Sequence, residues 1–139
     1  MTDRPGASAP KEARSADGRR IALEPLARAI CRRYGREFDD SVRYGDAAHD
    51  WCVHDTQYVL AWAIQQARDE TLDLVAQIRW LASLLGARGF PLERLARNLE
   101  IASEVTASGP SLGALAEPVS QSLAAVSRLV IPPRRPPTS

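Results

Sequence analysis

The chain has 139 residues, a length that predicts a single domain. Apolar residues make up 45% and charged residues 25% of it, which is ordinary for a globular protein, and the net charge is +1. So small a net charge excludes a strong overall field that would draw the chain to nucleic acid or to anionic lipid. The apolar runs also stay short of the roughly 18 residues that span a bilayer, so no membrane partner is expected.

The two ends of the chain differ in composition from its middle. Residues 1–20 are rich in Gly, Ala, Ser, Pro and charge and predict a disordered arm, whereas residues 132–139 predict an extended Pro- and Arg-rich tail. The N-terminal segment has no apolar signal core, so a cytoplasmic location is expected. The two cysteines, Cys31 and Cys52, match no zinc-site spacing. We therefore expect them to be reduced thiols that fill the core of a domain over 21–131.

Helical periodicity runs through this domain, and no alternating strand pattern interrupts it. Gly35 is expected to end the first helix, and either Asp69 or Thr71 to cap the fourth. Pro118 either kinks the last helix or marks its true first turn. The helices predicted in chain order cover residues 24–34, 37–44, 46–68, 71–87, 91–107 and 112–131.

The joining segments are short, which favours antiparallel neighbours. We therefore predict an all-α fold, an up-down helical bundle of five to six helices with disordered termini. The helix over 46–68 carries apolar residues on a wide arc and is expected to be central. The helix over 71–87 carries apolar side chains off its main stripe, which face either a second neighbour or a partner chain. The candidate residues for a homodimer interface are Trp80, Leu84 and Arg88.

The start of the helix over 46–68 gathers two carboxylates and an imidazole on one face, as a divalent-metal site would need. Metal sites in helical bundles draw ligands from facing helices, and no second helix here carries a comparable motif. An acidic first turn that complements the helix dipole is the favoured interpretation. No metal or other cofactor is therefore predicted, and the weak metal candidates are Asp46, His49, Asp50 and His54.

Three aromatic residues in the same helix, Trp51, Tyr58 and Trp62, share one stripe. Such a stripe packs in a core or lines a pocket for a planar ligand, and in a pocket His54 and Gln65 would be its polar anchors. Motifs for nucleophilic catalysis, such as G-x-S-x-G or a P-loop, do not occur. The prediction is therefore a protein that is not an enzyme.

One segment, "LLGARGFPLERLARNLE", has the pattern helix, tight turn, helix, with arginines at positions 88, 94 and 97. A DNA-binding helix-turn-helix has a broadly similar pattern. The acidic residues Glu93 and Glu100 are interleaved with the arginines and dilute the positive charge. An ordinary helical hairpin is therefore favoured over nucleic-acid binding.

Two segments within residues 53–100, "VHDTQYVLAWAIQQ" and "QIRWLASLLGARGFPLERLARNLE", carry a family resemblance. Together they resemble the small helical module that precedes cobalamin-binding domains in some bacterial sensory and regulatory proteins. In those proteins a Rossmann-like half with an Asp-x-His-x-x-Gly motif follows, and this chain has no such half. The resemblance therefore implies a stand-alone regulatory or protein-interaction module and not cobalamin binding.

These observations lead to one prediction of function and several alternatives. We expect a non-enzymatic bacterial module that acts in signalling or transcription regulation through protein-protein contacts, as a homodimer. The first alternative is a small-molecule sensor with an aromatic pocket, for a ligand that includes the tetrapyrrole type. A DNA-binding regulator and a metal-dependent enzyme are less favoured.

Overall fold

The computed structural model describes residues 8–69 and 71–131. Helices make up most of this part of the chain, so the predicted all-α bundle is confirmed, and a small two-stranded sheet accompanies it. The elements in chain order are β1 (Glu12–Arg14), β2 (Arg20–Ala22), α1 (Leu23–Glu37), α2 (Ser41–Tyr44), α3 (Ala48–Asp69), α4 (Leu74–Ala87), α5 (Leu92–Ser108), the 3-10 helix η1 (Pro110–Leu115) and α6 (Ala116–Ser127).

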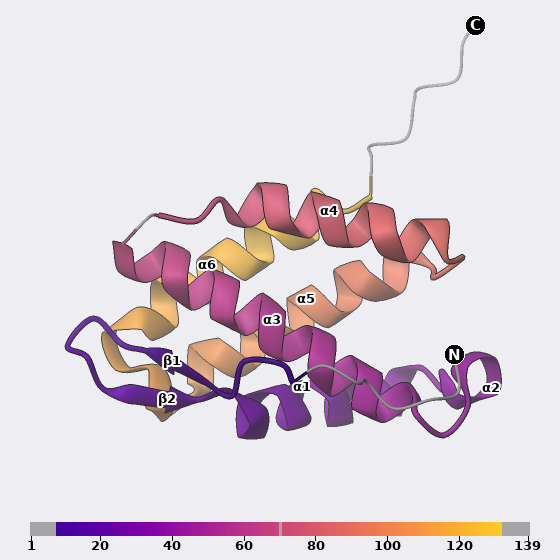
Figure 1. Ribbon diagram of the computed structural model, residues 1–139, viewed down its shortest axis with the longest axis horizontal. Helices are drawn as coiled ribbons and strands as arrows, with labels where there is room; N and C mark the ends of the chain where they lie inside the picture. The colour runs from indigo at the N-terminus through magenta and orange to yellow at the C-terminus, as the bar shows by residue number, and fades with distance from the viewer. Residues whose placement is uncertain (1–7, 70, 132–139) are drawn as a thin grey trace, which may run out of the picture.

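The long helices run in alternating directions along the molecule, as expected for an up-down bundle (Figure 1). In this view α3 crosses the front, α4 lies along the top and α1 along the bottom, while α5 and α6 lie behind. The most extensive helix packing is between α5 and α6, and α3 contacts α1, α4 and α6. The predicted central position of α3 is therefore confirmed.

One apolar core lies between these helices, built from inward stripes that repeat every three or four residues. Burial of each Leu or Ile side chain stabilises the fold by about 1.5–3 kcal/mol relative to exposure. The largest side chains that are fully buried include Ile30 of α1, Leu60 and Ile64 of α3, Ile78 of α4, Leu99 of α5 and Leu123 of α6.

Several helix ends differ from the expected positions, including the start of α2 at Ser41 and the end of α6 at Ser127. Gly35 lies inside α1, which continues to Glu37. The cap of α4 is Asp73, whose side chain accepts a hydrogen bond from the backbone N–H of Ala76. The expected last helix is divided, because Gly113 has φ 54° and ψ −127°, a backbone conformation that glycine adopts easily. Pro118 then lies in the first turn of α6, the second of the two expected positions.

A hairpin replaces part of the expected disordered arm. Strands β1 and β2 are antiparallel, with Ala13 opposite Ile21, and Gly18 at φ 83° lies in the turn between them. Ile21 is fully buried in the core, and the Gln57 side chain donates a hydrogen bond to the carbonyl of Pro10. The hairpin is therefore held by the bundle. Residues 1–7 of the arm and the tail over 132–139 lie outside the described residues.

Candidate functional site

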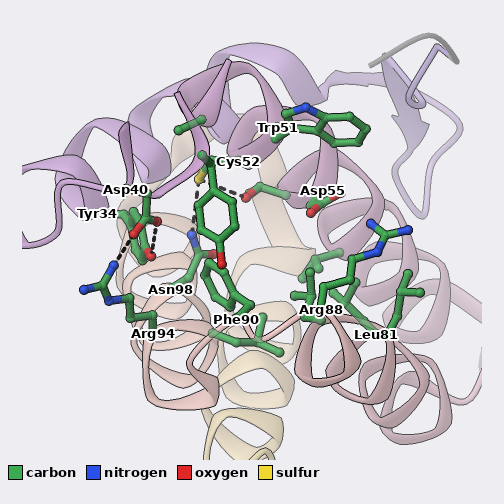
Figure 2. A pocket seen from close by; sticks show the side chains of 17 residues that line it. Tyr34, Asp40, Trp51, Cys52, Asp55, Leu81, Arg88, Phe90, Arg94 and Asn98 are labelled. Carbon is green, nitrogen blue, oxygen red and sulfur yellow. Dashed lines mark hydrogen bonds and ion pairs between the residues drawn. The ribbon is translucent and has the colours of Figure 1, made fainter. Parts of the chain in front are cut away.

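A cavity of about 130 Å³ lies at the end of the bundle where α2 is found. Its walls come from α2, the first half of α3, the end of α4 and the start of α5, with Tyr34 of α1 at one side (Figure 2). Most of the lining surface is apolar. The apolar lining residues include Val59, Leu81, Leu84, Leu85, Phe90 and Leu95.

A hydrogen-bonded cluster of Tyr34, Asp40 and Arg94 forms one side of the cavity (Figure 2). The Tyr34 hydroxyl donates to Asp40 Oδ2 at 2.5 Å, and the Arg94 guanidinium pairs with the other oxygen of Asp40. Burial and the neighbouring Asp40 carboxylate raise the pKa of Tyr34 far above its usual range. Arg94 also lies over the ring of Phe38, 5.0 Å from the centroid. The three groups are thus engaged with one another and tie α1, α5 and the residue before α2 together.

Asp55 and Arg88 lie together on the other side of the cavity (Figure 2). Asp55 Oδ1 lies 3.2 Å from Nδ1 of His54, and its side chain is 37% exposed. Burial raises the pKa of the Asp55 carboxyl, while His54 and the positive charge of Arg88 oppose that rise. This side of the cavity therefore carries one acidic and one basic group close together.

The Tyr44 hydroxyl is the unusual polar group of the cavity wall. The oxygen is buried and has no hydrogen-bond partner among the described residues. Its ring packs against Phe90, with 5.8 Å between centroids, and the residue belongs to the cavity lining. Buried hydroxyls are nearly always hydrogen-bonded in folded proteins. No sequence signal distinguishes Tyr44, which ends a helix of four residues.

Cys31 of α1 and Cys52 of α3 are joined by a disulfide, so the prediction of reduced thiols is wrong for this structure. The two residues are 21 positions apart in the chain, but α1 and α3 pack side by side and bring their Cα atoms to 6.1 Å. Cys52 also lies in the cavity wall, where its sulfur accepts a hydrogen bond from the side chain of Asn98. The disulfide thus adjoins the cavity.

The aromatic stripe of α3 is placed mostly outside the cavity. Trp51 is a lining residue, but the His54, Tyr58, Trp62 and Gln65 side chains are not. The His54 ring lies edge-on between Trp51 and Tyr58, at 5.5 and 5.3 Å between centroids, and Trp62 follows at 6.0 Å from Tyr58. This half-buried ladder runs along α3, and Gln65 donates to Thr71 beyond it. Ligand binding by the ladder stays a prediction.

The three expected interface residues, in α4 and at its C-terminal cap, do not form one outward surface. Trp80 is 58% exposed, whereas Leu84 is half-buried in the cavity wall and Arg88 lies at the edge of the cavity beside Asp55. A second hollow of about 420 Å³ lies between α4 and α6. This groove is lined by apolar side chains that include Val75, Ile78, Ala82, Leu92, Val126 and Leu129.

The candidate metal ligands are not brought together. Over residues 8–69 and 71–131, no three His, Cys, Asp or Glu side chains form a group able to hold a metal ion. His49 and Asp46 are exposed, and His54 turns into the aromatic ladder. The weak candidate set of Asp46, His49, Asp50 and His54 is therefore not supported by the geometry.

Two of the clustered arginines are neutralised by carboxylates. Arg94 pairs with Asp40, and Arg97 binds both oxygens of Glu37 at 2.8 Å and one oxygen of Glu100 at 3.0 Å. The Arg97 guanidinium lowers the pKa of Glu37. These arginines are thus held between α1 and α5 and do not form a free cationic surface for phosphates.

No family model, curated protein or solved structure matches the chain. The resemblance to the module that precedes cobalamin-binding domains therefore stays a prediction. Among the helices of the described residues, none has the length and apolar character needed to cross a membrane.

Proposed function

We propose that this chain is a non-enzymatic sensory module that binds a small molecule in the cavity and regulates protein contacts in response. The observation that carries the proposal is the buried Tyr44 hydroxyl, which has no partner among the described residues and belongs to the lining of a largely apolar cavity. Ligand sites combine apolar walls with a few placed polar groups of this kind. Bacterial signalling or transcription regulation, the expected setting, is part of the same proposal.

The size of the cavity limits the ligand. An engineered apolar cavity of about 150 Å³ binds benzene, and the present volume of about 130 Å³ is close to that. Pockets for drug-sized ligands are larger, about 300–1,000 Å³. The volume therefore supports a molecule with one ring inside the cavity, which is too small to enclose a tetrapyrrole.

Binding is favoured over catalysis because most polar groups in the wall are engaged with each other. Asp40 is held by Tyr34 and Arg94, and Thr56 lies 3.5 Å from the sulfur of Cys31. General acid-base work needs a group that can reach a substrate proton. The engaged carboxylate of Asp40 is poorly suited to that task, and the Asp55 carboxylate, whose Oδ1 faces His54, is assigned here to ligand binding.

Helix α4 is the proposed link between the cavity and a partner. Its residues Leu81, Leu84 and Leu85 line the cavity, and the same helix carries Trp80 exposed on the outside. Exposed tryptophan is enriched in protein interfaces. A second copy of the chain is the proposed partner, and a ligand that displaces α4 would alter that contact.

A cytoplasmic location remains part of the proposal, although the disulfide opposes it. Disulfides persist in oxidising compartments and are rare in the cytosol, where thiols are kept reduced. A cytoplasmic protein would hold Cys31 and Cys52 mainly as thiols. Acid quenching of cells followed by alkylation measures their state: two alkylated cysteines support the cytoplasm, and two protected cysteines contradict it.

Binding of benzene tests the proposed site, because benzene fits the volume and brings no polar group. Ligand-observed NMR should show saturable binding to the natural protein. Leu84→Phe adds bulk to the cavity wall and should abolish that binding. Leu129→Phe is the matched control, since Leu129 lines the groove and not the cavity. Failure of benzene and every other one-ring molecule to bind would overturn the proposed function.

A further inference from the structure

The polar groups of the cavity restrict the chemistry of its ligand, an inference that rests on the function proposed above. We infer that the cavity takes a neutral one-ring molecule that carries a hydroxyl group, a ligand of the phenol class. The inference combines three observations: the volume of the cavity, the hydroxyl in its wall, and the opposed charges on one of its sides.

Shape and lining favour a ring. Phe90, Tyr44 and Trp51 all belong to the cavity lining, together with the leucines of α4 and Leu95 of α5. Aromatic side chains pack well against the face or the edge of a further ring. The volume of about 130 Å³ leaves room for one ring and small substituents.

The polar groups of the wall that retain hydrogen-bonding capacity include a hydroxyl and a carboxylate. The Tyr44 hydroxyl has no partner among the described residues and can both donate and accept. The Asp55 carboxylate interacts with His54 through Oδ1, which leaves the lone pairs of Oδ2 for another donor. A ligand hydroxyl suits either group, because it donates one hydrogen bond and accepts others. A purely apolar ring would leave the Tyr44 hydroxyl unpaired, which is unfavourable.

The opposed charges of Asp55 and Arg88 disfavour a charged ligand. An anionic ring would be attracted by Arg88 but repelled by Asp55. A cationic ring would be attracted by Asp55 but repelled by Arg88. Both groups lie on the same side of the cavity (Figure 2), so a charged ligand next to one of them also experiences the charge of the other. In such a site a neutral polar ligand avoids the repulsion and also the cost of stripping water from an ion.

Four probes of similar size test the inference: benzene, phenol, benzoate and benzylamine. Calorimetry or ligand-observed NMR should show that phenol binds about tenfold more tightly than benzene. A difference of this size is what one hydrogen bond typically contributes to affinity. Benzoate and benzylamine should both bind more weakly than phenol. Equal affinity for phenol and benzene, or tighter binding of either ion, would overturn the inference and leave the proposed binding function standing.

The Tyr44→Phe variant tests the role of the hydroxyl. It should lower the affinity for phenol about tenfold and leave the affinity for benzene unchanged. Tyr58→Phe is the matched control, because Tyr58 is a half-buried tyrosine outside the cavity lining. If Tyr44→Phe lowers the affinities for phenol and benzene equally, the hydroxyl has no specific role and the inference fails.

Charge variants test the exclusion of ions independently. Asp55→Asn should strengthen benzoate binding about tenfold or more, because Arg88 then acts without an opposing carboxylate. Arg88→Gln should strengthen benzylamine binding in the same way. Asp46→Asn and Arg79→Gln change the same charges away from the cavity lining and should leave both affinities unchanged. Charge variants that change neither affinity would contradict the inference.

Discussion

At the scale of single residues, two tyrosines of the cavity wall have opposite environments. The Tyr34 hydroxyl donates to Asp40, and the Tyr44 hydroxyl has no partner among the described residues. A hydrogen bond to a carboxylate stabilises a fold by about 1.5–3 kcal/mol. Tyr34→Phe should therefore lower the free energy of unfolding by about that amount, and Tyr44→Phe should leave it unchanged or raise it. Urea unfolding measures both, and equal losses would contradict the assignment.

Asp55 should make stability depend on pH. Burial raises the pKa of its carboxyl in the folded state, so the folded state binds its proton more tightly than the unfolded state does. Its contribution is fully present below the unfolded pKa and is lost as pH rises through the folded pKa. Asp55→Asn should thus raise the free energy of unfolding at pH 7, by under about 1 kcal/mol because the side chain is partly exposed.

The same substitution should have little effect at pH 3, where Asp55 is protonated in both states. Thermal unfolding of the natural protein and the variant at the two pH values measures the difference. Asp46→Asn provides the control, since Asp46 is exposed. An Asp55→Asn effect of the same size at both pH values would show that ionisation of Asp55 is not its cause.

At the scale of elements, the long helices were predictable because each carries an inward apolar stripe, as α4 does with Leu74, Ile78 and Leu81. The ends of the helices were less predictable, because capping depends on backbone geometry that periodicity does not report. The cap of α4, for example, is Asp73. The hairpin was missed because strands of three residues are too short for their alternation to be recognised in the sequence. Its position depends on the burial of Ile21 in the core and on the hydrogen bond from Gln57 of α3 to Pro10, contacts that the sequence does not indicate.

The disulfide joins two elements and should contribute strongly to stability. It closes a segment with a sequence separation of 21 residues, for which loop-closure entropy gives about 3 kcal/mol. The double variant Cys31→Ala, Cys52→Ala should lose about that free energy of unfolding. A reductant should destabilise the natural protein by a similar amount and leave the variant unaffected. An unchanged midpoint of denaturation on reduction would contradict this contribution.

At the scale of the whole molecule, the cavity could not be found from the sequence. Its lining residues Asp40, Asp55, Arg88 and Asn98 come from distant parts of the chain. Periodicity shows which side of a helix is apolar, but not how far each helix is rotated or where neighbouring helices diverge. The sequence therefore indicated Trp51 and Leu84, yet it missed Tyr44 and the opposed charges of Asp55 and Arg88.

The proposed homodimer also belongs to this scale. Sedimentation should show a dimer at concentrations on the order of tens of micromolar. Trp80→Ala should shift it toward the monomer, because Trp80 is an exposed aromatic side chain of α4. Val42→Ala serves as the control, since Val42 is 87% exposed and belongs to α2, not to α4. A natural protein that sediments as a monomer would contradict the dimer.

The most direct test of the account is a map of backbone amide shifts during titration with phenol. We expect saturable shifts at the amides of residues that line the cavity, including Tyr44, Asp55 and Phe90, and loss of these shifts in Leu84→Phe. Amides of the β1–β2 hairpin, such as that of Ala13, should stay unchanged. Shifts confined to the groove between α4 and α6, or no saturable shift at millimolar phenol, would contradict the claim that the cavity is a ligand site.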